Sequence, residues 1–259
     1  MTPRLYVQDL PLAQLALTDT AVALPDGPAR HVQVLRLQPG DALALFDGRG
    51  DEWQATVVGM GRKEVTVQVG ALQPTDRELR TPVTLAVGMP ANDRMDALVE
   101  KATELGVAAI QPLVCARSVL RLDGERAAKK VAHWQSVAVA ASEQSGRTRV
   151  PVIHPVATLK AWLSSGGAGA GAGGDGSDAT HSRGVLSFEP QAQVAQWLPQ
   201  LPAASPLVFL SGPEGGLSPE ELQQALQAGW TPVGLGPRVL RADTAPLMAL
   251  SLVAGLSLG

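Results

Sequence analysis

Two glycine-rich loops contain the residues whose types and spacing could do chemistry. One is SGPEGG at residues 211–216, and the other is LGPRVLRADTAP at residues 235–246. Neither loop contains the GKS or GKT of a phosphate-binding P-loop, and neither has the spacing of the Rossmann dinucleotide fingerprint. Backbone N–H and C=O groups that are presented without side chains suit a neutral planar ring such as adenine. An ordinary Gly-Pro turn would explain SGPEGG equally well.

Two arginines in the second loop favour a binding function. Arg238 and Arg241 lie among apolar neighbours, where a guanidinium needs an anionic or hydrogen-bonding partner. Each loop follows a short apolar run, and ligands of open α/β sheets bind beyond the carboxyl ends of the strands. We therefore expect the two loops to form the walls of one pocket.

The elements that must position these loops alternate between strand and helix. Apolar runs predict strands at residues 83–88, 107–114, 184–188, 206–211 and 231–236. Between the first two strands, apolar residues recur at helical spacing up to Gly106, and a longer helix is predicted at 125–145. Ser218 and Glu221 have the spacing of a capping box, which marks a helix start. The alternation predicts an α/β domain with a mainly parallel sheet.

The N-terminal part has a different pattern. Residues 40–48, 52–60 and 64–70 alternate apolar and polar positions between glycine-rich turns, which predicts a hairpin meander. An amphipathic helix is predicted at 28–37. The polar stretch at 73–82 reads as a linker, so we predict domains at residues 1–73 and 74–259. Residues 164–182 are almost entirely Gly, Ala, Ser and Asp, which predicts a flexible insertion.

Composition excludes several classes of protein. The net charge of −3 excludes a polycation, and the lone Cys115 excludes an intramolecular disulfide and a paired-cysteine zinc site. The first residues lack the apolar region of a signal peptide. The apolar C-terminal stretch is shorter than the roughly 20 residues that span a bilayer. We therefore expect a cytosolic protein that needs no metal.

One segment is basic in this acidic chain. Between Arg117 and Arg149 the sequence has seven Lys and Arg residues but three Asp and Glu residues. A solvated helix face and a phosphate-binding surface would both produce this pattern. His31 and His133 lie in apolar helical contexts, which favours packing or surface roles.

Several segments resemble one family. LSGPEGGLSPEE (210–221) and GLGPRVLRADTA (234–245) are similar to the two signature segments of the RsmE family. Further similar segments are HVQVLRLQPGDALALFDG (31–48), KATELGV (101–107) and SEQSGRTRVP (142–151). The resemblance covers nearly the whole chain except the glycine-rich insertion. Ala242 and Asp243 depart from the usual family pattern LRTETA.

The resemblance implies a fold and an activity. RsmE proteins methylate N3 of a uridine in the 16S rRNA of the small ribosomal subunit, with S-adenosylmethionine as methyl donor. They belong to the SPOUT superfamily, so we expect an α/β domain with a C-terminal trefoil knot after a small PUA-like β-barrel that binds RNA. Open alternatives are a related enzyme acting on transfer RNA or another rRNA position, and a non-catalytic RNA-binding module.

The resemblance assigns the cofactor-binding residues by matching position, and the expected reaction suggests the catalytic candidates. Arg241 and Arg147 would hold a substrate phosphate or the developing uracil oxyanion, while Glu143 and Asp243 would remove the N3 proton or position those arginines. Expected RNA-binding residues are Arg126, Lys129, Lys130 and Arg94, of which Arg94 has contact with the second subunit as an alternative. Lys101 and Glu104 read as a structural ion pair. The expected cofactor-binding residues are Leu210, Gly212, Glu214, Gly215, Leu235, Gly236 and Leu240. SPOUT relatives pair through the knotted region, and the helix expected at 244–258 is apolar all round, so a homodimer is expected.

Overall fold

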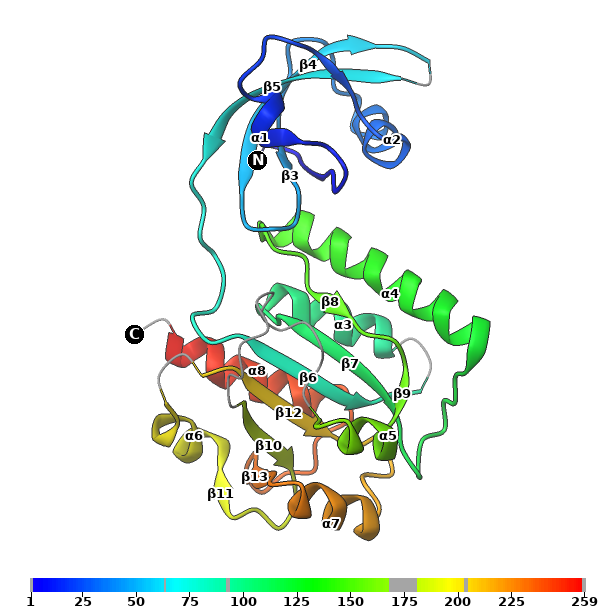
Figure 1. Ribbon diagram of the computed structural model, residues 1–259, viewed down its shortest axis with the longest axis vertical. Helices are drawn as coiled ribbons and strands as arrows, with labels where there is room; N and C mark the ends of the chain where they lie inside the picture. The colour runs from blue at the N-terminus through cyan, green and yellow to red at the C-terminus, as the bar shows by residue number, and fades with distance from the viewer. Residues whose placement is uncertain (1, 63, 92–93, 168–180, 203–204, 258–259) are drawn as a thin grey trace. The chain divides into compact units, whose positions relative to one another are not determined.

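The computed structural model describes residues 2–62, 64–91, 94–167, 181–202 and 205–257. These residues form two compact units (Figure 1). The first unit consists of residues 1–78 together with 142–150, and the second of residues 79–141 together with 151–259. The boundary predicted between residues 73 and 74 thus lies inside the first unit, and the sequence did not assign residues 142–150 to it. Most of the predicted glycine-rich insertion, residues 168–180, lies outside the described residues.

The first unit is built on a five-stranded sheet with the order β1-β3-β4-β5-β2. Strands β3, β4 and β5 pair antiparallel in sequence order, which confirms the predicted meander. Valines at alternate positions of β5 point into an apolar core, and polar residues alternate with them. The strands and helices of this unit are β1 (Arg4–Tyr6), α1 (Leu12–Leu15), β2 (Val22–Ala23), α2 (Asp26–Val34), β3 (Ala42–Phe46), β4 (Glu52–Met60) and β5 (Val65–Gln73).

The second unit contains an eight-stranded sheet, whose main path has the order β11-β13-β10-β12-β6-β7-β8, with β9 paired to β7. Every pairing in it is parallel, as predicted. All residues of β6 and β12 are buried, as expected for parallel strands covered on both faces. The strands are β6 (Val83–Gly88), β7 (Ala109–Val114), β8 (Val152–Ile153), β9 (Ala157–Thr158), β10 (Ser182–Leu186), β11 (Ala192–Gln193), β12 (Leu207–Ser211) and β13 (Thr231–Gly234).

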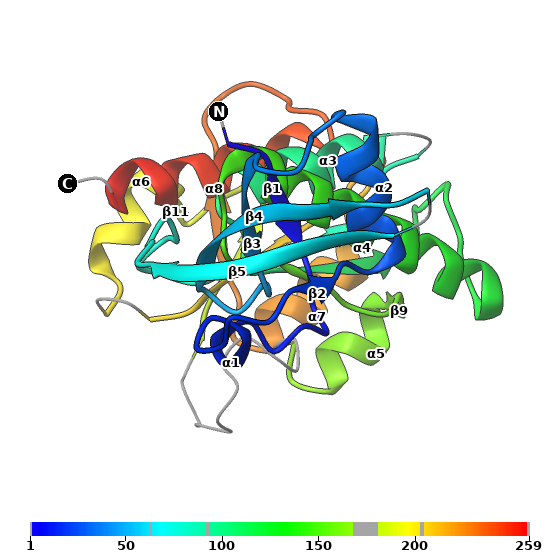
Figure 2. The same ribbon diagram turned by 90° about the horizontal axis from the view of Figure 1, so that it is seen from above.

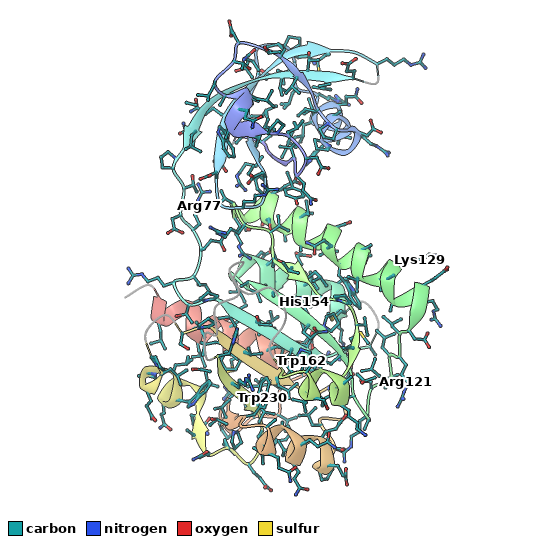
Figure 3. The ribbon with its side chains drawn as sticks, viewed as in Figure 1. Arg77, Arg121, Lys129, His154, Trp162 and Trp230 are labelled. Carbon is teal, nitrogen blue, oxygen red and sulfur yellow. The ribbon has the colours of Figure 1, made fainter. Side chains whose placement is uncertain are left out.

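Helices cover both faces of this sheet (Figure 2). Helices α5 and α7 pack on one face, where the ring centroids of Trp162 and Trp230 lie 5.5 Å apart in a tilted arrangement, and α3 and α8 lie together on the other. Figure 3 shows the two tryptophans side by side. The helices are α3 (Arg94–Glu104), α4 (Gly124–Ser145), α5 (Leu159–Ser164), α6 (Val194–Trp197), the 3-10 helix η1 (Leu198–Gln200), α7 (Pro219–Gln227) and α8 (Thr244–Ser257).

Local sequence signals predicted several helix ends correctly, whereas α2 (Asp26–Val34) begins and ends two to three residues before the predicted 28–37. The capping box at the start of α7 is present, with the Ser218 hydroxyl accepting from Glu221 N–H and the Glu221 carboxylate accepting from Ser218 N–H. Helix α3 is followed by Gly106 at φ +94° and α4 by Gly146 at φ +86°. The strand predicted at 184–188 is displaced, because β10 ends at Leu186 and leaves Phe188 in the following turn.

Two further predictions have different outcomes. None of the helices in the described ranges is long and apolar enough to cross a membrane. The trefoil knot stays a prediction, because strand order and register do not define how the chain is threaded.

Candidate active site

A pocket of about 630 Å³ lies at the carboxyl ends of three neighbouring strands of the second unit. The turns after β12 and β13, which the sequence predicted to share a pocket, both line it. The turn after β10 forms a third wall that the sequence did not predict. The lining residues are Arg94, Arg117, 186–188, 212–217, Leu222, Val233, 235–236, 238–242 and Ala245.

The first loop requires glycine at its start because backbone approaches backbone there. A Cβ atom at Gly212 would lie 2.6 Å from the Leu217 backbone nitrogen. A Cβ atom at Gly88, the last residue of β6, would lie 2.5 Å from the Pro213 ring. Glycine therefore allows the loop to fold back on itself and on the end of β6.

Gly215 packs closely against Arg117, and its approach to a ligand stays a prediction. The sequence suggested that Gly215 lacks a side chain so that its backbone can approach a ligand. In the structure, a Cβ atom at Gly215 would lie 3.0 Å from the Arg117 Cβ, and Arg117 Nη1 donates to the Gly215 carbonyl at 2.9 Å. The positive φ of this loop belongs to Gly216, at +69°. Arg117 is therefore a pocket residue that the sequence placed only in the basic segment. Its place just after the predicted strand at 107–114 could have indicated this.

Two glutamates attach the first loop and α7 to neighbouring loops. Glu214 Oε1 accepts a hydrogen bond from Ala91 N–H at 2.8 Å and lies 3.9 Å from the Arg94 guanidinium. Glu221 Oε1 accepts from Ala116 N–H at 2.7 Å. Because the Glu214 carboxylate is engaged in this way, its residue would contact a pocket ligand chiefly through its backbone.

The second loop presents open backbone and exposed cations to the pocket. Gly236 has φ +93° and nothing within 4 Å of a built Cβ, while its N–H donates to Gln193 Oε1 at 2.8 Å. Arg238 and Arg241 are exposed. The Arg241 carbonyl accepts from the N–H groups of Thr244 and Ala245 and so starts α8.

Two buried polar atoms border the loops without a hydrogen-bond partner. They are Ser211 Oγ, at the end of β12, and Asp243 Oδ1, within the second loop. Neither Ser211 nor Asp243 is among the residues that line the pocket.

The expected cofactor residues divide into two groups. Gly212, Glu214, Gly215, Leu235, Gly236 and Leu240 line the pocket. Leu210 does not, because its side chain is fully buried in the apolar core between the sheet and helices α5 and α7.

Arg147 and Glu143 lie in the first unit and do not line the pocket. Arg147 is 4% exposed and ion-paired with Glu78. Glu143 accepts from Tyr6 N–H at 2.9 Å, and burial raises the pKa of its carboxyl group despite that bond. The Arg4 guanidinium donates to the carbonyls of residues 142, 143 and 147. These contacts stabilise the segment 142–150 within its unit.

The expected RNA-binding residues lie in two different places. Arg126, Lys129 and Lys130 are exposed on the first half of α4, and Figure 3 shows Lys129 pointing outward from that helix. Arg94 instead lines the pocket. Asp96 of α3 holds α4 in place, because it accepts hydrogen bonds from His133 and Trp134.

Comparison with known proteins assigns a class to this arrangement. The family described as "RNA methyltransferase domain" matches residues 77–254, and the family described as "RNA methyltransferase PUA domain" matches residues 24–70. The chain is thus an RNA methyltransferase with an N-terminal PUA domain. This confirms the predicted order of a PUA-like domain followed by a SPOUT-type α/β domain.

Individual relatives show to which family of RNA methyltransferases the chain belongs. The chain is 32% identical to the ribosomal RNA small subunit methyltransferase E of Bacillus subtilis over 86% of this chain and 84% of that protein. It is also 32% identical to the ribosomal RNA small subunit methyltransferase E of Mycobacterium tuberculosis, over 97% of this chain and 91% of that protein. A crystal structure of the Neisseria gonorrhoeae enzyme bound to S-adenosyl methionine superposes with a TM-score of 0.83, at 32% identity, over 99% of this chain and 98% of that one. The chain therefore belongs to the ribosomal RNA small subunit methyltransferase E family.

Proposed function

We propose that this protein transfers the methyl group of S-adenosylmethionine to N3 of a uridine in the 16S rRNA of the small ribosomal subunit. The observation that carries the proposal is the pocket formed by three loops at the carboxyl ends of β10, β12 and β13, with exposed arginines at its edge. A relative with 32% identity binds S-adenosyl methionine.

The residues of the pocket fit this cofactor. Leu235, Leu240 and Val233 provide apolar surface for the adenine ring, and Gly236 leaves backbone accessible. Within the described residues, no cluster of His, Cys, Asp and Glu could hold a metal ion.

The bound cofactor supplies an activated methyl group, so the protein's task is orientation and control of one proton. Uridine N3 must lose its proton as it attacks, and negative charge develops on the uracil oxygens. Arg241 is the candidate for stabilising that charge, because its exposed guanidinium belongs to the pocket wall. Asp243 is the nearest carboxylate in sequence that could accept the proton or orient Arg241. Arg147 and Glu143 remain candidates only if substrate reaches the first unit.

We assign RNA binding to the first unit and to the exposed bases of α4. The PUA match covers most of the first unit's sheet. Arg126, Lys129 and Lys130 can neutralise backbone phosphates without sequence preference. We also propose that the enzyme acts in the cytoplasm, where its rRNA substrate is located.

We further propose a homodimer that forms through α8. Met248 and Leu252 are half-buried and Leu256 is 57% exposed, and the three are spaced four residues apart along the helix. This places an apolar stripe at the surface of a helix that packs on α3 and the sheet.

The function is tested by mass spectrometry of 16S rRNA from a deletion strain, with and without a plasmid copy of the gene. We expect one N3-methyluridine to disappear and to return. An unchanged 16S rRNA, with a missing methyl group on transfer RNA or 23S rRNA, would contradict the proposal.

Arg241→Ala then separates chemistry from cofactor binding. The backbone of the second loop stays in place, so cofactor affinity should stay within a few fold. Single-turnover methylation of small subunits should fall by about a hundredfold or more, the scale for losing one preorganised charge-stabilising donor. A loss of cofactor affinity would assign Arg241 to cofactor binding, and near-normal turnover would remove it from the mechanism.

A further inference from the structure

One aromatic side chain differs from all the others in the chain. The sequence has five tryptophans, three phenylalanines and one tyrosine, and all of them lie within the described ranges. The five tryptophans, Phe46 and Phe209 are buried, and Tyr6 is half-buried. Phe188 is 77% exposed, and it lines the pocket. A single exposed apolar residue is normal at a protein surface, but an exposed aromatic ring in a pocket wall offers a face on which a ligand can stack.

The backbone around Phe188 is held in place on both sides. Ser187 N–H donates to the Val233 carbonyl at 3.0 Å, and Glu189 N–H donates to Ser187 Oγ at 3.1 Å. Two residues later, Gln191 N–H donates to the Pro232 carbonyl at 2.8 Å. The turn is thus fixed to the edge of β13, and the exposed ring projects from an ordered backbone.

We propose that Phe188 stacks on the target uracil and so positions it for methyl transfer. This inference rests on the proposed function. A base that reacts at N3 has its reactive atom on the edge that pairs in a helix, so it must leave its partner before reaction. Unpaired bases in RNA are commonly held by stacking on aromatic side chains.

The uracil fits Phe188 better than the cofactor's adenine does. The adenine is expected between the glycine-rich loops, where Gly236 and the leucines provide a partly enclosed wall. Phe188 is mostly open to solvent, as are Arg238 and Arg241, which also line the pocket. An exposed ring together with two exposed cations suits a nucleotide that arrives from outside, with its base on the ring and its phosphates on the arginines.

The test compares Phe188→Ala, Phe188→Leu and Phe188→Tyr with wild type. Single-turnover methylation of small subunits from a deletion strain is measured beside calorimetric titration with S-adenosylmethionine. We expect Phe188→Ala to slow methyl transfer roughly tenfold to a hundredfold, the scale of one lost stacking contact. Phe188→Tyr should keep near-normal transfer and Phe188→Leu should not. Cofactor affinity should stay within about threefold in all three.

Val239→Ala is the matched control. Val239 is 81% exposed and lines the same pocket but has no ring, so its loss should change transfer less than Phe188→Ala does. Normal transfer by Phe188→Ala, or equal activity of Phe188→Leu and Phe188→Tyr, would overturn the proposal. A parallel loss of cofactor affinity would assign the ring to adenine and would also overturn it.

A second measurement does not depend on turnover. Small subunits that contain 5-iodouridine are cross-linked to wild-type protein in the presence of S-adenosylhomocysteine, and the attached peptide is identified by mass spectrometry. We expect a link between Phe188 and a uridine. If wild type methylates no small-subunit uridine, the proposed function fails, and a uridine link to any other residue refutes the stacking role separately.

Discussion

Substituting Gly212 by alanine tests whether close backbone packing forms the cofactor pocket. A Cβ atom at this position would lie 2.6 Å from the Leu217 nitrogen and 2.7 Å from the Gly216 carbonyl carbon. Ordinary contacts of a Cβ begin near 3.4 Å, so the two ends of the loop must separate by several tenths of an ångström. Both obstructing atoms are backbone, so a change of side-chain rotamer cannot relieve the overlap.

The magnitude follows from the cost of overpacking. An extra methyl group in a tightly packed site typically costs about 1–3 kcal/mol. If that strain opposes the bound form of the loop, the dissociation constant for S-adenosylmethionine rises roughly fivefold to a hundredfold. Gly88→Ala obstructs the same loop from the β6 side, at the Pro213 ring, and should have a similar effect. Calorimetric titration of each variant gives the constants directly.

Gly229→Ala is the control for general destabilisation. Gly229 follows α7, has φ +84°, and has no atom within 4 Å of a built Cβ. Alanine in this left-handed conformation should lower stability by roughly 1 kcal/mol without affecting the pocket. We therefore expect a lower melting temperature with normal cofactor affinity. A wild-type dissociation constant in Gly212→Ala would refute the role given to this packing.

Three further predictions concern residues outside the pocket. Burial raises the pKa of Glu143, so ionisation of its carboxyl group opposes folding as the pH rises toward that raised pKa. Glu143→Gln keeps an acceptor for Tyr6 N–H, so its stability at pH 7 should match or exceed that of wild type. Its methyl transfer should be normal. A hundredfold loss of transfer with intact cofactor binding would instead make Glu143 catalytic. Burial acts to raise the pKa of Asp96, but hydrogen bonds from α4 outweigh burial and lower the pKa. The contribution of Asp96 to folding stability is therefore present at neutral pH and is lost as the pH falls through the lowered pKa. Asp96→Asn should therefore lower the melting temperature by about 2–4 °C at pH 7 and less in acid, and an equal loss at every pH would contradict this. Replacing Lys129 and Lys130 by glutamine should weaken RNA binding and flatten its salt dependence by roughly one unit of slope per lost phosphate contact, and an unchanged slope would favour a solvated helix face.

Much of the second unit could be predicted because its signals are local. The capping box at Ser218 and the glycine after α3 depend on residues a few positions apart, and the structure confirms both. The mainly apolar run at 206–211 predicted a strand, and the structure has β12 at Leu207–Ser211. The two loops were placed at one pocket by a rule about parallel sheets, which needs only the order of the strands.

The roles of other residues depend on contacts between distant parts of the chain. Arg117 reaches the Gly215 carbonyl across 98 positions, and no local pattern indicates that pair. The segment 142–150 belongs to the first unit, where Arg4, near the start of the sequence, donates hydrogen bonds to its carbonyl groups. Phe188 was assigned to a strand because apolar character continues past the point where β10 stops pairing.

The distribution of contacts explains how loops rich in glycine can form a defined pocket. Glycine gains freedom in the unfolded chain and in any loose loop, so an ordered glycine loop must be held by its neighbours. Here side chains of residues 117, 214 and 221 hydrogen-bond to or from backbone groups of adjoining loops, and they join the ends of β6, β7 and β12. The ordered loops can receive the cofactor with little further loss of entropy. The exposed side chains at the edge, Phe188, Arg238 and Arg241, make no such contacts among the described residues, which agrees with the role in substrate binding that we propose for them.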